Sequence, residues 1–440
     1  GAGGNWAAEA QFGLWSPANL LVAMVLSKIP HLAVAATLAK QGAMLLLTLG
    51  AYLLFRHYGA GRWPSVAVAS ALPFAGFTLY FDASTWIAGL LAFAWTPWFW
   101  WAARRCLHGG GSLPVYVVGY LTVTNGNPYG VVAILFVLAG LAAEAVATRR
   151  WRGLARLVIV GACVGTAAAV AYLPMAATAA SGWRGEAGLV GNTNELAPDL
   201  GMRAASSAPS MLPLLNMWTL HGTAAPATYT AWFLLPLVPW LAWGGLRRRG
   251  AEFAAVYVVG GLFALLVLGP SELWLFRWPV RLVQYVFLAS GVLVAVLITQ
   301  GLATQAGRLK AASSFGIVAL GAWLAFAARP DLVGRHLTGT LVVLGLVGVV
   351  VAAARYRPAS VSAAMITGTG IVLALQLAWV PSNHDVMIWR APTRIATFEQ
   401  YAVSHPGAVV QIAHADLIPV DQRTAAASEL DATFVATDIS

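Results

Sequence analysis

Long apolar runs alternate with short polar segments along most of this chain. A helix that crosses a bilayer needs roughly 20 mostly apolar residues, and twelve runs approach that length, one of them being short. The pattern therefore predicts an all-α polytopic membrane protein whose transmembrane domain covers residues 31–380. The predicted spans lie at about 31–55, 64–81, 85–103, 113–124, 129–148, 156–176, 229–246, 253–269, 282–302, 313–328, 337–354 and 361–380.

The amino-acid composition agrees with a membrane location. The 440 residues are 59% hydrophobic and 10% charged, whereas a soluble domain carries about 25% charged residues. The net charge of +10 comes from basic residues in short clusters between the apolar runs. Such clusters are typical of membrane topology and not of a surface that binds nucleic acid. We therefore expect membrane lipids, and no nucleic acid, among the partners.

Charge in the loops predicts an orientation. Basic clusters mark cytoplasmic loops, and every cluster falls on the same side of the predicted topology. Fourteen of the sixteen acids, all but Glu144 and Glu252, fall on the other side. Together the two patterns place the acids on the extracytoplasmic face. The preference for Arg over Lys and for Ala, Val, Gly and Leu suggests a GC-rich bacterial genome, so we expect a bacterial plasma membrane. The basic clusters are Arg56 with Arg62, Arg104 with Arg105, the group Arg149, Arg150, Arg152 and Arg156, then Arg247 to Arg249, Arg308 with Lys310, and Arg355 with Arg357.

Three segments lie outside the predicted bilayer on the extracytoplasmic side. Residues 1–30 contain an apolar stretch, Asn19 to Leu26, that is too short to span and predicts an interfacial or re-entrant helix. Residues 177–228 form a polar loop of a length that is often functional. Residues 381–440 are charged, and "AVVQIAHADLIP" predicts a strand of a small α/β soluble tail that is cut short. Nothing in the first segment would translocate it, so we expect an upstream span and about thirteen spans in the native protein.

Two carboxylates on the extracytoplasmic side are candidate catalytic residues. Asp82, in "TLYFDASTW", lies at the outer junction of the second and third spans, where an ionisable group is costly unless it is paired or functional. A helix cap is the structural alternative for Asp82. Glu9 lies on the same face as Trp6, and it is either catalytic or a solvated position of an amphipathic helix. Trp6 and Trp86 are candidates to stack on a sugar acceptor.

Three basic residues are candidate ligands of an anion. Lys40 falls nearly ten residues into the first span, so its cation either faces an internal anionic group or reaches a structural carboxylate such as Asp82. Arg277 and Arg281, in "ELWLFRWPVRLVQY", lie one helical turn apart and can share a face. The planar fork of Arg suits a phosphate at membrane depth, whereas a pair of headgroup anchors is the alternative. We predict that Arg277 and Arg281 bind a lipid phosphate or diphosphate and that Lys40 faces an anionic group.

The long loop offers candidates for the acceptor. Glu195, Trp218 and His221 are polar or aromatic residues that could line an acceptor groove, and an ordinary hydrated loop is the alternative. His384 and Asp385 are adjacent but lack a third ligand, so the sequence predicts no metal site. A Gly-rich phosphate loop, HExxH and GxSxG are absent, which disfavours an ATP-driven pump, a zincin protease and an α/β-hydrolase.

Several stretches resemble one known family. "QFGLWSPANLL", "LPFAGFTLYFDASTW" with the following "WTPWFWWAARR", "TVTNGNPYG" and "FRWPVRLVQYVFLASGVL" are similar to the bacterial YfhO-like membrane proteins and, more broadly, to the GT-C glycosyltransferases. The similarity covers about residues 1–300. It implies a GT-C-like helical bundle that transfers a sugar from a polyprenyl-phosphate donor to a glycan or lipid-linked acceptor outside the cytoplasm, with inversion of configuration.

The resemblance also implies roles for individual residues. An acidic residue of the first outer loop acts as general base in that family, which points to Glu9, to Asp82 of a later loop, or to a residue upstream of Gly1. Basic residues near the outer membrane surface hold the donor phosphate, which points to Arg277 and Arg281, with Lys40. A divalent cation assists some relatives, although no cluster of ligands in this sequence requires one. Such a protein would serve the biogenesis of the bacterial cell wall.

Two other classes of function remain open at this point. A transporter or flippase for lipid-linked substrates would need polar groups near the midplane of several helices, and only Lys40 and Gln41 meet that requirement. A non-catalytic membrane scaffold would use the tail to bind a partner. The leading hypothesis is the glycosyltransferase, because the acids gather on the face where a lipid-linked sugar would be presented.

Overall fold

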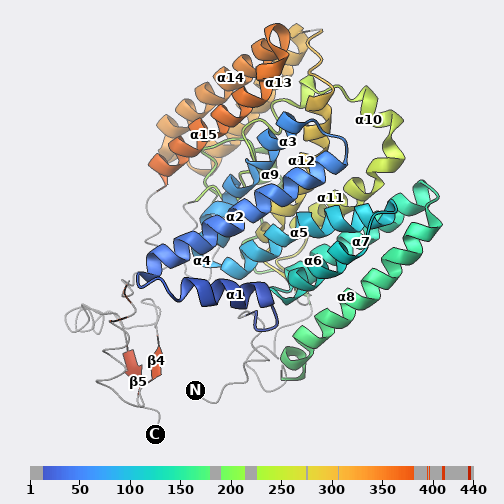
Figure 1. Ribbon diagram of the computed structural model, residues 1–440. Helices are drawn as coiled ribbons and strands as arrows, with labels where there is room; N and C mark the ends of the chain where they lie inside the picture. Colours follow the sequence, from blue (N-terminus) through green and yellow to red (C-terminus); the bar gives the residue numbers. More distant parts are fainter. Residues whose placement is uncertain are drawn as a thin grey trace.

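The computed structural model describes residues 13–178, 190–213, 225–273, 276–305 and 307–380, together with 394, 396, 409–411 and 435–437. Most of these residues belong to α-helices that pack into one bundle (Figure 1). The helices are α1 Pro17–Leu26, α2 Leu32–His57, α3 Arg62–Ala69, α4 Ala83–Thr85, α5 Ile87–Leu107, α6 Leu113–Thr124, α7 Tyr129–Ala147, α8 Trp151–Ala177, α9 Leu200–Ala204, α10 Gly244–Arg248, α11 Ala254–Val267, α12 Val283–Thr299, α13 Gly307–Ala328, α14 Val333–Tyr356 and α15 Val361–Trp379.

Short helical turns and small sheets complete the fold. A three-stranded antiparallel sheet joins β1, β2 and β3, and a separate antiparallel pair joins β4 and β5. The 3-10 turns are η2 Leu72–Phe74, η6 Val238–Trp240, η7 Gly250–Phe253, η8 Pro279–Leu282, η9 Pro330–Leu332 and η10 Pro358–Ser360, and η3 Thr78–Asp82 is a π-helical turn. The strands are β1 Val190–Gly191, β2 Glu272–Leu273, β3 Phe276–Arg277, β4 Val409–Gln411 and β5 Val435–Thr437.

The bundle has the helices of a multi-pass membrane protein. Within the described ranges, eight helices are long and apolar enough to cross a bilayer, or up to nine if the bent pair Arg62–Phe74 and Thr78–Thr85 forms one span. Large apolar side chains such as Leu341 and Leu265, each 70% exposed, cover the outside of the bundle. Lipid would solvate such a surface without cost. The all-α membrane architecture is therefore supported, whereas the predicted count of twelve or thirteen spans is not confirmed.

One predicted span is wrong. Residues 229–246 do not form a continuous helix but a series of turns, the short η6 and the short α10. Pro236 and Pro239 remove two backbone donors that a helix would need, and they break the helical pattern. The segment is nevertheless buried, and its backbone is satisfied by neighbours, since the Ser207 hydroxyl donates to the Ala231 carbonyl at 2.8 Å. Irregular backbone at membrane depth is stable only when protein surrounds it in this way.

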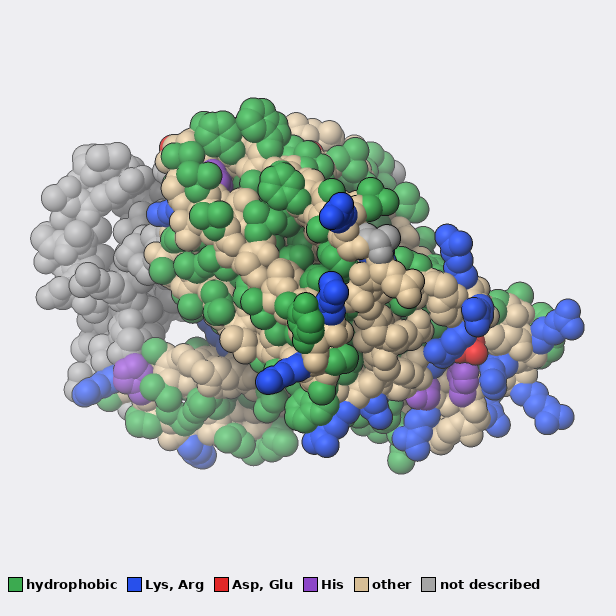
Figure 2. All heavy atoms as spheres, turned by 90° about the horizontal axis from the view of Figure 1, so that it is seen from above, with side chains coloured by type: hydrophobic (Ala, Val, Ile, Leu, Met, Phe, Trp, Pro, Cys, Tyr) green, Lys and Arg blue, Asp and Glu red, His purple; other side chains and the backbone are tan. Residues whose placement is uncertain are grey.

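Basic residues gather at one end of the bundle. Figure 2 shows many Lys and Arg side chains gathered toward one side of the face in view. The C-terminal ends of α2, α5, α7 and α12 meet there, and the Gly61 N–H donates to the Thr299 hydroxyl at 2.6 Å. We call this the basic end. Asp82 and Arg281 belong to the opposite end, because α5 and α12 begin beside them.

The two acids that broke the predicted charge pattern are both paired at the basic end. Glu144 is fully buried, and its carboxylate lies 2.9 Å from both the Arg104 guanidinium and the His108 ring. Glu252 pairs with Arg249 at 2.7 Å on the surface. A buried carboxylate is stable only when it is paired and hydrogen-bonded. The pairing therefore explains why these two acids lie among the basic clusters.

The predicted elements outside the bundle are present in part. α1 contains the whole stretch predicted as an interfacial helix, and its Asn19 amide donates to the Asn125 carbonyl at 3.0 Å. β4 falls inside the stretch predicted as a strand of the tail. Two short paired strands do not establish an α/β domain, so that part of the prediction remains untested. The core lies between the long helices, where Phe93, Trp100 and Phe287 are fully buried.

Candidate functional site

Asp82 ends a bent and buried stretch of helix. The chain turns by 48° between Arg62–Phe74 and Thr78–Thr85. Asp82 is the last residue of the π-helical turn η3 and is 3% exposed. Single π-helical turns are rare and frequently occur at functional sites. A carboxyl group in this position is costly to bury, which makes its partners informative.

The Asp82 carboxyl contacts α12 and α5. The Gln284 amide donates to Oδ2 of Asp82 at 2.9 Å, and the Thr78 hydroxyl donates to Oε1 of the same Gln284 at 2.7 Å. On the other side, a Cβ atom at Gly89 would lie 2.5 Å from Oδ1 of Asp82. Only a glycine therefore leaves room for the carboxyl against the first turn of α5. The hydrogen-bonded chain Thr78, Gln284 and Asp82 fixes the carboxyl in one place.

Arg281 lies near Asp82 in an aromatic box. Its Cζ atom is 3.9 Å from the ring centre of Trp278, 5.0 Å from that of Trp86 and 5.5 Å from that of Tyr129. The guanidinium and the Asp82 carboxyl are close enough to attract each other, but they do not form an ion pair within 4 Å. Among the described residues, Arg281 has no carboxylate partner. The box stabilises the cation through the faces of its rings, and the absence of a carboxylate at ion-pair distance leaves the cation able to bind another anion.

Arg277 does not share a helical face with Arg281, contrary to the prediction. Arg277 ends β3, and Arg281 lies in η8, with Trp278 in the left-handed region between them. Pro279 cannot donate a backbone hydrogen bond, and the left-handed residue before it prevents a continuous helix. The half-exposed Arg277 side chain pairs with Glu272 at 3.0 Å. Its role as a phosphate ligand remains a prediction.

Tyr129 fixes the loop that carries both arginines. Its hydroxyl accepts from the Arg277 N–H at 2.9 Å and also donates to the carbonyl of Arg277. The ring of Tyr129 forms one wall of the box around Arg281. α7 thereby holds the backbone of one arginine and the side chain of the next. Sequence reasoning noted "TVTNGNPYG" only as part of a resemblance and missed this role.

The other predicted residues have different outcomes. The Lys40 ammonium donates to the Ser84 carbonyl at 3.1 Å, so it holds the chain just after Asp82 and does not pair with that carboxylate. Glu195 is half-buried, and the next residue, Leu196, accepts a 3.0 Å hydrogen bond from the Val280 N–H. The long loop therefore reaches the backbone beside Arg281. Trp6, Glu9, Trp218 and His221 lie outside the described residues.

Gln284 was also missed by sequence reasoning. A single amide in an apolar run carries no motif, and its relation to Asp82 depends on a contact across 202 residues. One signal was available, because Gln284 follows Arg281 by three residues and thus lies on the same side of the helix start. Like Lys40, Gln284 is a polar residue inside a predicted span, where a polar group is costly unless it is paired or functional.

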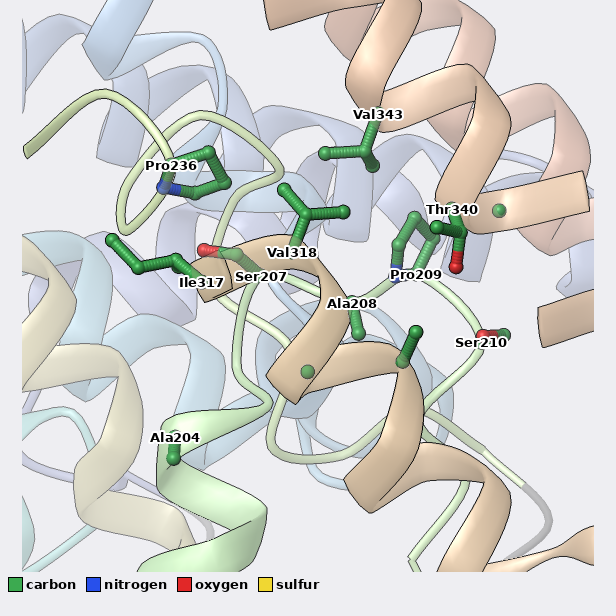
Figure 3. Close-up of a pocket in the computed structure, with 13 residues that line it drawn as sticks. Ala204, Ser207, Ala208, Pro209, Ser210, Pro236, Ile317, Val318, Thr340 and Val343 are labelled. Atoms are coloured by element: carbon green, nitrogen blue, oxygen red, sulfur yellow. The ribbon is translucent and has the colours of Figure 1, made fainter. Parts of the chain in front are cut away.

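Outside the Asp82 and Arg281 region, the described chain offers a small cavity but no cluster of metal ligands. No group of three or more His, Cys, Asp or Glu residues within the described chain is arranged to hold a metal ion. A small cavity lies between α13, α14 and the loop after α9, and Figure 3 shows Val318, Thr340 and Ser207 on its walls. Its lining contains no charged side chain and none of the residues around Asp82. The Asp82 and Arg281 region is therefore the strongest candidate site.

The arrangement is suited to acid and anion chemistry at a membrane surface. A carboxyl held at a fixed place can exchange a proton with a hydroxyl. A nearby unpaired guanidinium can stabilise a developing negative charge. Fold and site together define a helical multi-pass protein with a carboxyl and a cation at the end opposite the basic clusters. Comparisons with protein-family models, with curated proteins and with solved structures find no match.

Proposed function

We propose that this protein is a membrane glycosyltransferase that moves a sugar from a polyprenyl-phosphate donor to an extracytoplasmic acceptor of the bacterial cell envelope. Asp82 takes the proton of the acceptor hydroxyl while the oxygen of that hydroxyl attacks the anomeric carbon of the sugar. The bond from that carbon to the phosphate oxygen breaks, and the phosphate leaves with the electron pair. Arg281 balances the charge of the leaving phosphate, and the attack from the opposite face inverts the configuration.

The observation that carries the proposal is that a fixed carboxyl and a cation without a carboxylate partner lie near each other at one end of the bundle. Asp82 is fixed by Gln284, and Arg281 lies nearby without a carboxylate of its own. A cation that is not neutralised by protein is available for an anionic ligand. The resemblance of the quoted stretches to GT-C enzymes supplies the substrate class, and the charge pattern of the loops supplies the extracytoplasmic side.

The proposal is tested by transfer from defined donors. The full chain in lipid nanodiscs is incubated with a panel of radiolabelled polyprenyl-phosphate sugars and an envelope extract as acceptor. We expect Asp82→Asn to lower the rate about a hundredfold or more, as for loss of a general base. Arg281→Ala should abolish transfer as well, with both variants still monodisperse in detergent. Turnover at the original rate in both variants would overturn the assignment of the site.

Transport is a second candidate, and one observation favours it. The bent pair of helices and the irregular segment after residue 225 meet inside the bundle, where the Gly76 N–H donates to the Tyr229 carbonyl at 2.8 Å. Broken helices and unwound backbone in the interior are typical of transporter substrate sites. In a flippase, Asp82 and Arg281 would bind a lipid-linked substrate without breaking a bond.

A flipping assay separates the two candidates. The chain is reconstituted into liposomes with a fluorescent polyprenyl phosphate, and a membrane-impermeant quencher reports the lipid that crosses to the outer leaflet. We expect no acceleration over protein-free liposomes if the protein is a transferase. Fast crossing that is lost in Arg281→Ala, without any sugar transfer, would replace the first proposal by the second.

A further inference from the structure

Trp278 has an unusual backbone conformation. Its φ of 61° and ψ of 76° lie in the left-handed region. A bulky residue at positive φ is an outlier, and the following Pro279 further favours an extended conformation at this position. Strain of this kind persists only where the surroundings impose it, and it clusters at ligand sites. Here the backbone N–H of Trp278 donates to the Ser271 carbonyl at 3.0 Å, and this hydrogen bond holds the strained turn in place.

The strained backbone places the indole ring inside the candidate site. The ring lies 3.9 Å from the Arg281 guanidinium carbon. It also makes edge contacts with Trp86, at 6.0 Å between ring centres, and with Phe81, at 6.4 Å. Phe81 is the neighbour of Asp82 along the chain. The indole thus packs between the Arg281 cation and the segment that carries the Asp82 carboxyl.

The indole nitrogen of Trp278 is buried and has no hydrogen-bond partner within the described part of the chain. Two buried indoles elsewhere in the bundle are satisfied, since Trp100 donates to the Tyr58 hydroxyl at 3.1 Å and Trp240 to the Ser314 hydroxyl at 2.8 Å. An unpaired buried donor is costly. Trp95 and Trp232 share this property, but neither contacts Arg281. At Trp278 the free donor coincides with backbone strain and an unpaired cation, and this coincidence points to a ligand.

We propose that Trp278 is a second donor of the anion site, and that its indole N–H binds an oxygen of the same phosphate that Arg281 binds. The inference rests on the proposed function in one respect, namely that Arg281 holds a phosphate. A guanidinium and a neighbouring indole can each donate a hydrogen bond of defined direction to one tetrahedral anion. The ligand class is a phosphate group, which an isoprenyl phosphate or free inorganic phosphate could supply.

A spectroscopic experiment reports on the indole itself. The full chain is labelled on its indole nitrogens, and the resonance of Trp278 is assigned by its disappearance in Trp278→Phe. We expect that resonance to shift downfield when geranyl monophosphate is added, because the indole proton gains a charged acceptor. The same addition to Arg281→Ala should leave the resonance in place. Inorganic phosphate, added separately, shows whether the phosphate suffices or the isoprenyl chain is also required.

A binding experiment measures how much the indole N–H of Trp278 contributes to the affinity for a phosphate. Trp278→Phe keeps an aromatic ring over Arg281 and removes the N–H, so we expect geranyl monophosphate to bind about tenfold more weakly, as for loss of a hydrogen bond to a charged group. Trp95→Phe is the matched control, because it removes an unpaired buried indole N–H that does not contact Arg281. Its affinity should equal that of the unchanged chain.

The possible outcomes separate this inference from the proposed function. If Arg281→Ala loses binding while Trp278→Phe binds normally and the indole resonance does not move, Trp278 is not a donor, and the phosphate site of Arg281 stands. If the unchanged chain binds neither probe, the phosphate site itself is refuted. If Trp278→Phe does not fold, the resonance of Trp278 is assigned with Trp278→Tyr, and the shift in the unchanged chain decides the question.

Discussion

The Gln284 amide donates to the buried Asp82 carboxyl at 2.9 Å and at the same time accepts from the Thr78 hydroxyl at 2.7 Å. The two bonds link α12 to the π-helical turn η3. Arg281 precedes Gln284 by three residues, just before the first turn of α12. One end of one helix therefore positions both the carboxyl and the cation of the candidate site. The relative placement of these two groups is sensitive to Gln284, which itself carries no charge.

The first prediction concerns Gln284→Leu. Removing the amide leaves the Asp82 carboxyl without its hydrogen bond, and a buried polar group that loses its partner costs about 1–3 kcal/mol. We expect sugar transfer to fall more than about tenfold, while the unfolding midpoint drops modestly. Gln376→Leu is the control, because this buried amide donates to the Pro209 carbonyl at 3.1 Å away from the site. Equal loss of transfer in both variants would reduce Gln284 to a purely structural role.

The second prediction concerns the space beside the carboxyl. In Gly89→Ala the new methyl group would lie 2.5 Å from Oδ1 of Asp82, so the carboxyl must move. We expect transfer to fall sharply with little change in helix content. Gly165→Ala is the control, since no atom lies within 4 Å of its Cβ position, and alanine in a helix is about 0.5–1 kcal/mol more stable than glycine. Unchanged transfer in Gly89→Ala would mean that the Asp82 carboxyl can move aside without loss of activity, which would contradict the role of its fixed position.

Much of the fold could be predicted from the sequence, because apolar runs and basic clusters are local signals. The runs at 31–55, 129–148 and 337–354 each coincide over most of their length with a long helix. The prediction of a span at 229–246 was wrong for a physical reason. Mean hydropathy measures burial, and this segment is buried, but two prolines direct its backbone into turns that only neighbouring protein can satisfy. Hydropathy alone cannot distinguish a buried turn from a helix in lipid.

The candidate site could be predicted only as separate parts. Asp82 was identified because an ionisable residue at a membrane boundary is costly, and Arg281 because its planar guanidinium suits a phosphate. Their proximity depends on the packing of η3 against α12, and no spacing in the sequence reports that contact. Arg277 was assigned to the face of Arg281 by helical spacing, and the left-handed Trp278 shows why that assignment failed. The reach of the Lys40 ammonium to the Ser84 carbonyl was likewise a tertiary contact.

The third prediction concerns the tyrosine that fixes the arginine loop. In Tyr129→Phe the N–H and the carbonyl of Arg277 both lose their partner. We expect weaker binding of geranyl monophosphate, because the loop that carries Arg281 loosens, and a loss of about 1–3 kcal/mol in the free energy of unfolding. Tyr120→Phe removes one exposed hydrogen bond, that to the Trp15 carbonyl at 2.9 Å, and should leave binding intact. Binding lost to the same extent in both variants would contradict a specific role for Tyr129.

The fourth prediction contrasts the two acids of the basic end. Glu144 is fully buried with Arg104, whose guanidinium also lies 3.8 Å from the ring centre of Tyr58. Glu144→Gln leaves that cation buried and without its counter-charge, so we expect the free energy of unfolding to fall by about 3–5 kcal/mol. In Glu252→Gln the lost partner is Arg249, and both side chains are well exposed at 46% and 39%. Solvent screens such a pair, so the expected loss is below about 1 kcal/mol.

Unfolding by detergent titration of the purified chain measures both changes under one condition. Phosphate binding, measured on the fraction that remains folded, should be unchanged in both variants, because Glu144 and Glu252 lie at the end opposite Arg281. If Glu144→Gln lowers the free energy of unfolding only slightly, water or another group reaches Arg104 at the basic end. Weaker phosphate binding in Glu144→Gln would show instead that α7, which begins at Tyr129 and carries Glu144, transmits changes from the basic end to the arginine loop.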